Sequence, residues 1–329
     1  MQRPVVTYTP HIHTTDRVDK TMRNVLIALA PAAILGVYFF GLPALLVILV
    51  SVISAVLFEA GYQLLTRKSL TIGDGSAAVT GLLLAMILPP AVPLWLPIVG
   101  TFVAIVVVKQ VFGGLGQNFL NPALAARSIL TISFAGYMAA GFFMPLSGWI
   151  APDAITSPTP LALLNTVGAT PVAMDYVAAL FGSISGTIGE TSAIALLLGG
   201  LFLLITKTIS WHIPVSFIAT TFALTALIHP NGMMDSFAAY QLLLGGLMLG
   251  AFFMATDYPT SPMTSMGKLI FGIGCGALTV VIRLFSGFPE GVAYAILIMN
   301  LTVPLIDRFV RPRVFGTKKG KGKGAEKSL

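Results

Sequence analysis

Residues 43–65 read PALLVILVSVISAVLFEAGYQLL, a stretch in which Glu59 is the one charged side chain. A helix of about 20 apolar residues crosses the hydrocarbon core of a bilayer, so this stretch predicts a membrane span. The whole chain shares its character, because 56% of the 329 residues are hydrophobic and 9% are charged. This composition is typical of an integral membrane protein and argues against a soluble globule.

Similar segments recur along the chain, and they predict an all-α polytopic membrane protein with about ten transmembrane helices. The third and sixth predicted spans are short, which is typical of tilted or broken helices that neighbouring helices support, and the third and eighth are expected to be interrupted. The predicted spans are residues 24–41, 43–65, 76–91, 94–112, 119–144, 192–207, 213–229, 237–256, 268–285 and 291–306.

Two pairs of segments indicate an internal repeat. VTGLLLAMILPP (79–90) resembles LGGLMLGAFFMA (244–255), and VVVKQVFGGLG (106–116) resembles VVIRLFSGFPEG (280–291). Two halves of five spans each would face opposite ways in the membrane, because five is odd. The alternative is a chance likeness between spans that are rich in Leu, Gly and Ala.

The basic residues predict the orientation, because Lys and Arg collect on the cytoplasmic side. With the N-terminus inside, eighteen of the nineteen fall inside, and Arg283 alone lies near the outer face. Nine lie at or after Arg283, which indicates a lipid anchor and no nucleic-acid partner. The predicted parts are a cytoplasmic tail (1–23), two five-helix halves (24–144 and 192–306), an external loop (145–191) and a basic cytoplasmic tail (307–329).

The predicted external loop contains DAITSPTPL, residues 153–161. Thr159 stands between two prolines, whose fixed φ angles hold it extended and present its hydroxyl group outward. Ser157 and Asp153 lie just upstream. Such a hydroxyl could accept a phosphoryl-linked group, and an ordinary polar surface loop is the alternative.

The same stretch resembles the flavin attachment site of a known family. This family comprises the D subunit of the Rnf ferredoxin:NAD oxidoreductase complex and the B subunit of the sodium-translocating NADH:quinone reductase. Other blocks are also similar to it: GQNFLNPALAARSIL (116–130), ATDYPTSPMTSMGKLIFGIGCG (255–276), IRLFSGFPEGVAYAILIMN (282–300) and PLID (304–307). The resemblance covers nearly the whole chain.

The resemblance implies that FMN is joined through its phosphate to Thr159, by a separate flavin transferase. The chain departs from the common Ser-Gly-Ala by having Thr156-Ser157-Pro158 before this threonine. Thr170, in LNTVGATPV, fits the central Gly-Ala-Thr better but lacks the matching flanks. Thr159 is therefore the first candidate and Thr170 the second.

Polar residues near the predicted inner ends of spans are weaker candidates for a flavin pocket. Asn121 and Arg127 lie in the fifth predicted span and Asp257 at the end of the eighth. The resemblance implies a second, noncovalent flavin, which is riboflavin. The alternatives are an arginine that reaches the headgroups and an aspartate that ends a helix. Glu59 could handle ions or pair with a neighbouring helix.

The resemblance implies a subunit that carries electrons between ferredoxin-linked and NAD-linked partners and couples them to Na⁺ or H⁺ export across a prokaryotic cell membrane. The expected partners include a second FMN-bearing subunit and iron–sulfur subunits. A single cysteine, Cys275, cannot ligate an iron–sulfur cluster by itself. The alternative function is a secondary transporter or channel for a small solute.

Overall fold

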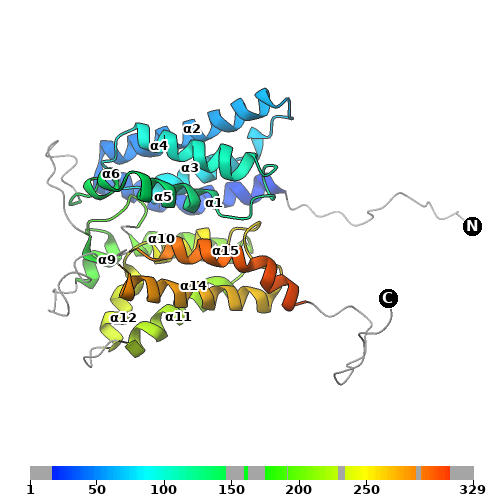
Figure 1. Ribbon diagram of the computed structural model, residues 1–329. Helices are drawn as coiled ribbons and strands as arrows, with labels where there is room; N and C mark the ends of the chain where they lie inside the picture. The colour runs from blue at the N-terminus through cyan, green and yellow to red at the C-terminus, as the bar shows by residue number, and fades with distance from the viewer. Residues whose placement is uncertain are drawn as a thin grey trace, which may run out of the picture.

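The computed structural model describes residues 17–145, 159–161, 175–190, 192–228, 234–286 and 290–311. Within this part of the chain, all of the secondary-structure elements longer than one residue are helices, and they form two groups (Figure 1). The first group comprises α1 to α6 and the second α10 to α15. Asp153, Ser157 and Thr170 lie outside the described residues.

Each group contains long helices and short or broken ones. The first consists of α1 (Val18–Phe40), α2 (Leu42–Leu65), η1 (Ile72–Asp74), α3 (Ser76–Met86), α4 (Trp95–Phe102), the π-helix η2 (Val103–Gln110), α5 (Pro122–Ser133) and α6 (Ala135–Ala140). The short α9 (Tyr176–Phe181) follows. The second consists of α10 (Ala193–Ile205), α11 (His212–Ile228), α12 (Met234–Leu243), α13 (Leu247–Leu249), the π-helix η3 (Gly250–Met254), α14 (Ser265–Phe285) and α15 (Val292–Phe309).

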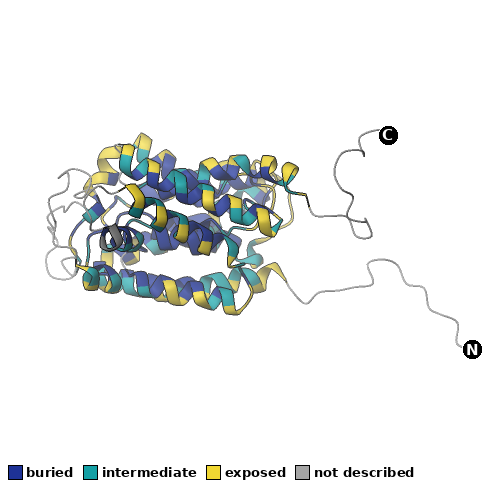
Figure 2. Cartoon of the chain, turned by 90° about the horizontal axis from the view of Figure 1, so that it is seen from below, coloured by how far each residue is buried: buried dark blue, intermediate teal, exposed yellow. Residues whose placement is uncertain are grey.

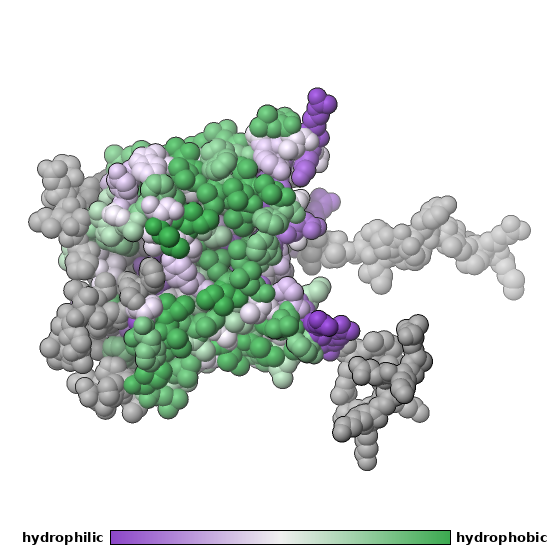
Figure 3. Space-filling model, viewed as in Figure 1, coloured by the Kyte–Doolittle hydropathy of each residue, from purple (hydrophilic) through white to green (hydrophobic). Residues whose placement is uncertain are grey.

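Four helices, α1, α2, α14 and α15, are long and apolar enough to cross a membrane by length and composition. A fifth candidate is a broken span, made of the helical segments Phe237–Leu243 and Leu247–Met254, which meet at a bend of 64°. The count is five if these two segments are taken as one span. Exposed residues line the outer faces of the helices (Figure 2), and apolar side chains cover the sides of the molecule (Figure 3). This is the surface of a protein whose sides face lipid.

The two ends of the bundle differ. The described chain begins and finishes at one end, which we call the terminus end (Figure 1). Hydrophilic side chains gather there (Figure 3). Helix α9 lies at the opposite end, which we call the loop end (Figure 1).

Two predicted spans are interrupted. The predicted span 119–144 is not one continuous helix, because the chain leaves the helical conformation at Phe134, between α5 and α6. Trp95 packs edge-on against Phe134 and Tyr137, with ring centroids 5.1 and 5.6 Å apart, and stabilises this break. The predicted span 237–256 breaks at two glycines with positive φ, Gly245 (65°) and Gly246 (64°).

The two groups share one hydrophobic core, to which buried residues of both contribute. Helix α1 packs on α10, and α5 packs on α15. The segment before α10 also reaches into the first group, where the backbone N–H of Gly189 donates to Met86 O (2.7 Å). The groups therefore form a single folded unit.

Candidate functional site

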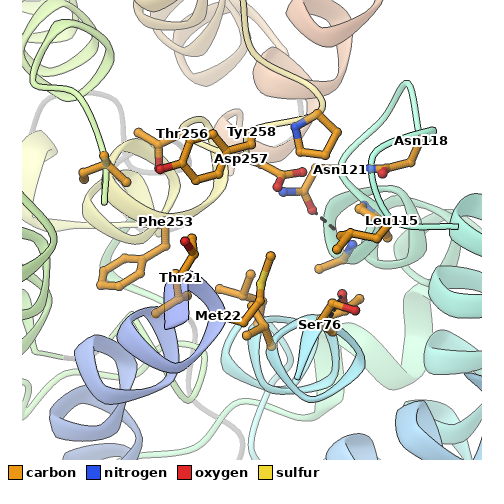
Figure 4. A pocket seen from close by; sticks show the side chains of 18 of the residues that line it. Thr21, Met22, Ser76, Leu115, Asn118, Asn121, Phe253, Thr256, Asp257 and Tyr258 are labelled. Carbon is orange, nitrogen blue, oxygen red and sulfur yellow. Dashed lines mark hydrogen bonds between the residues drawn. The ribbon is translucent and has the colours of Figure 1, made fainter. Parts of the chain in front are cut away.

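A cavity opens near the terminus end, between the two groups of helices (Figure 4). It encloses about 750 Å³ that no protein atom fills, including its open mouth. Apolar side chains of α1, α3, α10 and η3 form much of its wall, among them Met22, Leu83 and Phe253. Asn121 and Asp257, two of the predicted site residues, lie on it together. We call it the Asp257 cavity.

Asn121 begins α5 and joins the two groups. Its side-chain oxygen accepts hydrogen bonds from the backbone N–H groups of Ala123 (3.1 Å) and Leu124 (3.3 Å). Its amide nitrogen donates to Met254 O (3.2 Å), which the wide turn of η3 presents. Asn121 thus caps a helix and also holds η3 against the cavity.

Lys109 lies on the cavity wall and is almost fully buried, with 1% of its surface exposed. Its Nζ donates to both carboxylate oxygens of Glu59 at 3.0 Å and to Ser76 Oγ at 2.6 Å. Gln110 also donates to Glu59 (2.7 Å). The sequence left open whether Glu59 handles ions or pairs with a neighbouring helix; the structure shows the pairing.

Asp257 follows η3, outside the helices, and its Oδ2 accepts a hydrogen bond from Thr260 (3.3 Å). Burial raises the pKa of the Asp257 carboxyl group to about 6, and the Thr260 hydrogen bond and the charge of Lys109 offset this only in part. The carboxyl group can therefore change its charge close to neutral pH.

This pKa predicts a pH-dependent difference between the native chain and the Asp257→Asn variant. The carboxyl group has an ordinary pKa of 3.8, and in the folded chain it keeps its proton up to about pH 6. Between these values the folded state binds more protons, so native stability should fall relative to Asp257→Asn as pH rises from about 4 to 6. Melting curves followed by tryptophan fluorescence measure this difference. Melting temperatures that change in parallel with pH would contradict it.

A second, smaller pocket contains Thr159. With the open solvent at its mouth counted, it holds about 280 Å³ that no protein atom fills, and Thr159, Leu161, Glu190, Gly245 and Glu290 are among its lining residues. Thr159 itself is half-buried. We call this the Thr159 pocket. The Thr159 pocket lies close to the N-terminal ends of α10 and α15, away from the Asp257 cavity.

Arg127 does not line the Asp257 cavity, so the structure does not bring it together with Asn121 there. It lies six residues farther along α5, roughly 9 Å up the helix axis. There its guanidinium group pairs with Glu190 (3.5 Å) and with Glu290. The arginine is buried and ion-paired, and does not extend to lipid headgroups.

The prediction of orientation placed two buried basic residues at the surface of the membrane. Lys109 and Arg127 were counted at the inner surface, but both are buried against carboxylates. The exposed basic residues of the described chain are those that can report orientation, such as Arg23 and Arg67. Sequence reasoning also missed Lys109, Glu190 and Glu290 as site residues, although a lysine inside the apolar run VVVKQV was a signal.

Comparison with known proteins identifies the family. A family model described as "NQR2, RnfD, RnfE family" matches residues 5–316. The chain belongs to this family. Among its NQR2/RnfD/RnfE relatives, the D subunit of the Na⁺-translocating ferredoxin:NAD⁺ oxidoreductase complex of Acetobacterium woodii is 46% identical over 316 residues. That match covers 95% of this chain and 96% of the relative.

Two further relatives match over nearly their full length. The D subunit of the proton-translocating ferredoxin:NAD⁺ oxidoreductase complex of Clostridium ljungdahlii is 44% identical, over 95% of this chain and 96% of the relative. The D subunit of an ion-translocating oxidoreductase complex of Stutzerimonas stutzeri is 40% identical, over 91% and 92%. The family resemblance expected from the sequence blocks is thereby confirmed.

Proposed function

We propose that this chain is the D-type membrane subunit of an ion-translocating ferredoxin:NAD oxidoreductase complex. Its near full-length similarity to the D subunits of such complexes carries the proposal. The name of the Acetobacterium woodii relative, which is 46% identical, specifies Na⁺. The name of the Clostridium ljungdahlii relative, which is 44% identical, specifies protons. The exported ion is accordingly Na⁺ or H⁺. Partner subunits, including a second FMN-bearing subunit and iron–sulfur subunits, supply and accept the electrons.

Thr159 is the residue that would carry covalent FMN, attached by a separate transferase. Its half-buried side chain sits at a pocket rather than inside the core, which suits a hydroxyl group that must reach a second protein. Pro160 fixes the backbone beside it. When bound, the flavin supplies electron transfer in single steps; the chain supplies the attachment point and the pocket.

The Asp257 cavity is the site that we propose for a second, noncovalent flavin such as riboflavin. Ligand-binding pockets usually combine an apolar wall with a few polar groups that set orientation. Here Phe253 and Leu83 supply apolar wall, and Asn118 and Asp257 supply hydrogen-bonding groups. The π-helices η2 and η3 bring Lys109 and Phe253 to the cavity, and such helices are frequent at functional sites.

The topology that we propose has ten spans in two inverted halves, with both termini cytoplasmic and the flavin loop outside. Helix α1 contacts α10, and α5 contacts α15. In each pair the two helices hold the same position within their own halves, first or last, and this supports the repeat. Exposed Arg23 and Arg67 at or near helix ends support the orientation. Electrons would then pass between the Thr159 pocket outside and the Asp257 cavity inside.

The Thr159→Val variant tests the covalent flavin. The native chain, expressed with its partners and transferase, should run on a denaturing gel as a band with flavin fluorescence that survives boiling. Its intact mass should exceed that of the bare chain by one FMN ester. Both signals should be lost in Thr159→Val, because valine keeps the shape of threonine and lacks the hydroxyl group.

The control is Thr170→Val, which should keep the label. A label that persists in Thr159→Val and disappears in Thr170→Val would move the attachment site to Thr170. A native chain with the mass of the bare polypeptide would refute the flavin assignment and favour a solute transporter or channel, which a broken span bent by 64° would also suit.

A further inference from the structure

Charged residues from three separate parts of the chain meet at the Thr159 pocket. Glu190 and Glu290 line it. The guanidinium group of Arg127 in α5 pairs with both, through Nη1 to Glu190 Oε1 at 3.5 Å and through Nη2 to Glu290 Oε2. Arg127 and Glu190 are 9% and 6% exposed, so water screens this cluster poorly.

The position of Glu190 depends on the broken helix opposite. A Cβ atom on Gly246 would collide with Glu190 Oε1, and Gly246 has a φ of +64°. The missing side chain therefore leaves the space that the carboxylate group occupies. Arg127 then connects this carboxylate to Glu290, immediately before α15.

A second buried arginine stabilises the other wall of the pocket. Arg283 donates to the backbone oxygens of Gln241 (2.7 Å), Leu244 (2.9 Å) and Gly245 (3.0 Å). These carbonyl groups end α12, where the break leaves them without helical partners. The four charged groups around the pocket thus comprise two cations and two carboxylates.

We propose that Arg127 is a positioning residue for the flavin carried by Thr159. This inference rests on the proposed function, because it needs FMN at that threonine. By pairing with the two glutamates in the pocket, Arg127 fixes their position and offsets part of their charge. The reduction potential of the attached flavin therefore depends on Arg127 through Glu190 and Glu290.

The sign of the effect follows from charge. Reduction adds negative charge to a flavin, so a nearby unpaired carboxylate lowers its reduction potential and loss of a carboxylate raises it. Arg127→Met, which leaves two carboxylates unpaired, should lower the potential. Glu290→Gln, which leaves excess positive charge, should raise it. We expect about a tenfold change in the one-electron equilibrium in each case, which corresponds to about 59 mV.

The experiment is a redox titration of the covalent flavin in the purified complex, for the native chain and four variants. Arg127→Lys keeps the charge and should stay closer to the native potential than Arg127→Met. Asp175→Asn is the matched control, because Asp175 is exposed at the start of α9 and does not line the Thr159 pocket. The mass of each chain shows whether FMN is attached, independently of activity.

Opposite shifts for Arg127→Met and Glu290→Gln, with Asp175→Asn unchanged, would support the inference. Native potentials in both Arg127→Met and Glu290→Gln, with FMN attached, would overturn it and leave the proposed function intact. If Arg127→Met fails to fold, Glu290→Gln alone decides, and an unchanged potential overturns the inference. Absence of FMN from the native chain would instead refute the proposed function itself.

Discussion

Replacement of Lys109 by methionine should destabilise the chain by about 3–5 kcal/mol, the usual cost of removing one partner of a buried ion pair. Glu59, 1% exposed, would remain in the interior without the two 3.0 Å contacts to Lys109 Nζ. Ser76 Oγ would lose its 2.6 Å donor as well. Cys275, the single cysteine, is fully buried, so a thiol-reactive fluorescent dye measures unfolding of the purified chain.

Two further variants separate loss of the ion pair from loss of the lysine. Lys109→Met combined with Glu59→Leu should be less destabilising than Lys109→Met alone, because no unpaired charge remains. Lys207→Met, at an exposed lysine, should change stability by less than about 0.5 kcal/mol. Equal destabilisation by the single and double variants would contradict a cost that arises from the unpaired carboxylate.

The sequence predicted the helical membrane class, because apolar composition and segment length alone determine it. The bounds of α2 agree with the prediction within one residue. The break at Phe134 was missed, since it depends on a tertiary contact, whereas the eighth predicted span was expected to be interrupted and does break, at Gly245–Gly246. Trp95 packs on the first break, and Arg283 satisfies the carbonyl groups exposed at the second. Hydropathy carries no information about either contact.

The structure brings some of the candidate site residues together and separates others. Asn121 and Asp257 are 136 positions apart and share one cavity, as their common role in the prediction requires. Arg127 was grouped with Asn121 because both lie in the same predicted span. The partners of the Arg127 side chain are remote in sequence. Glu190 lies before α10 and Glu290 lies before α15. Nothing in their local sequence indicates that they converge on Arg127.

Close packing of α1 on α10 should make Gly199 intolerant of even one added carbon. A Cβ atom there would overlap the carbonyl oxygen of Ala28 and lie 3.0 Å from the ring of Phe253. Backbone cannot move aside as a flexible side chain can, so α1 and α10 must separate. We expect Gly199→Ala to cost about 1–3 kcal/mol, the usual range for overpacking. Dye labelling of Cys275 during heating measures the change.

Gly61→Ala provides the matched control, because a Cβ atom at this position in α2 meets nothing within 4 Å. Alanine is the better helix former by about 0.5–1 kcal/mol, so this variant should melt at or above the native temperature. The two identical substitutions should therefore shift stability in opposite directions. Because α1, α10 and η3 all line the Asp257 cavity, Gly199→Ala should also release noncovalent flavin that Gly61→Ala retains. Native melting and full flavin content in Gly199→Ala would show that the α1–α10 contact does not shape the cavity.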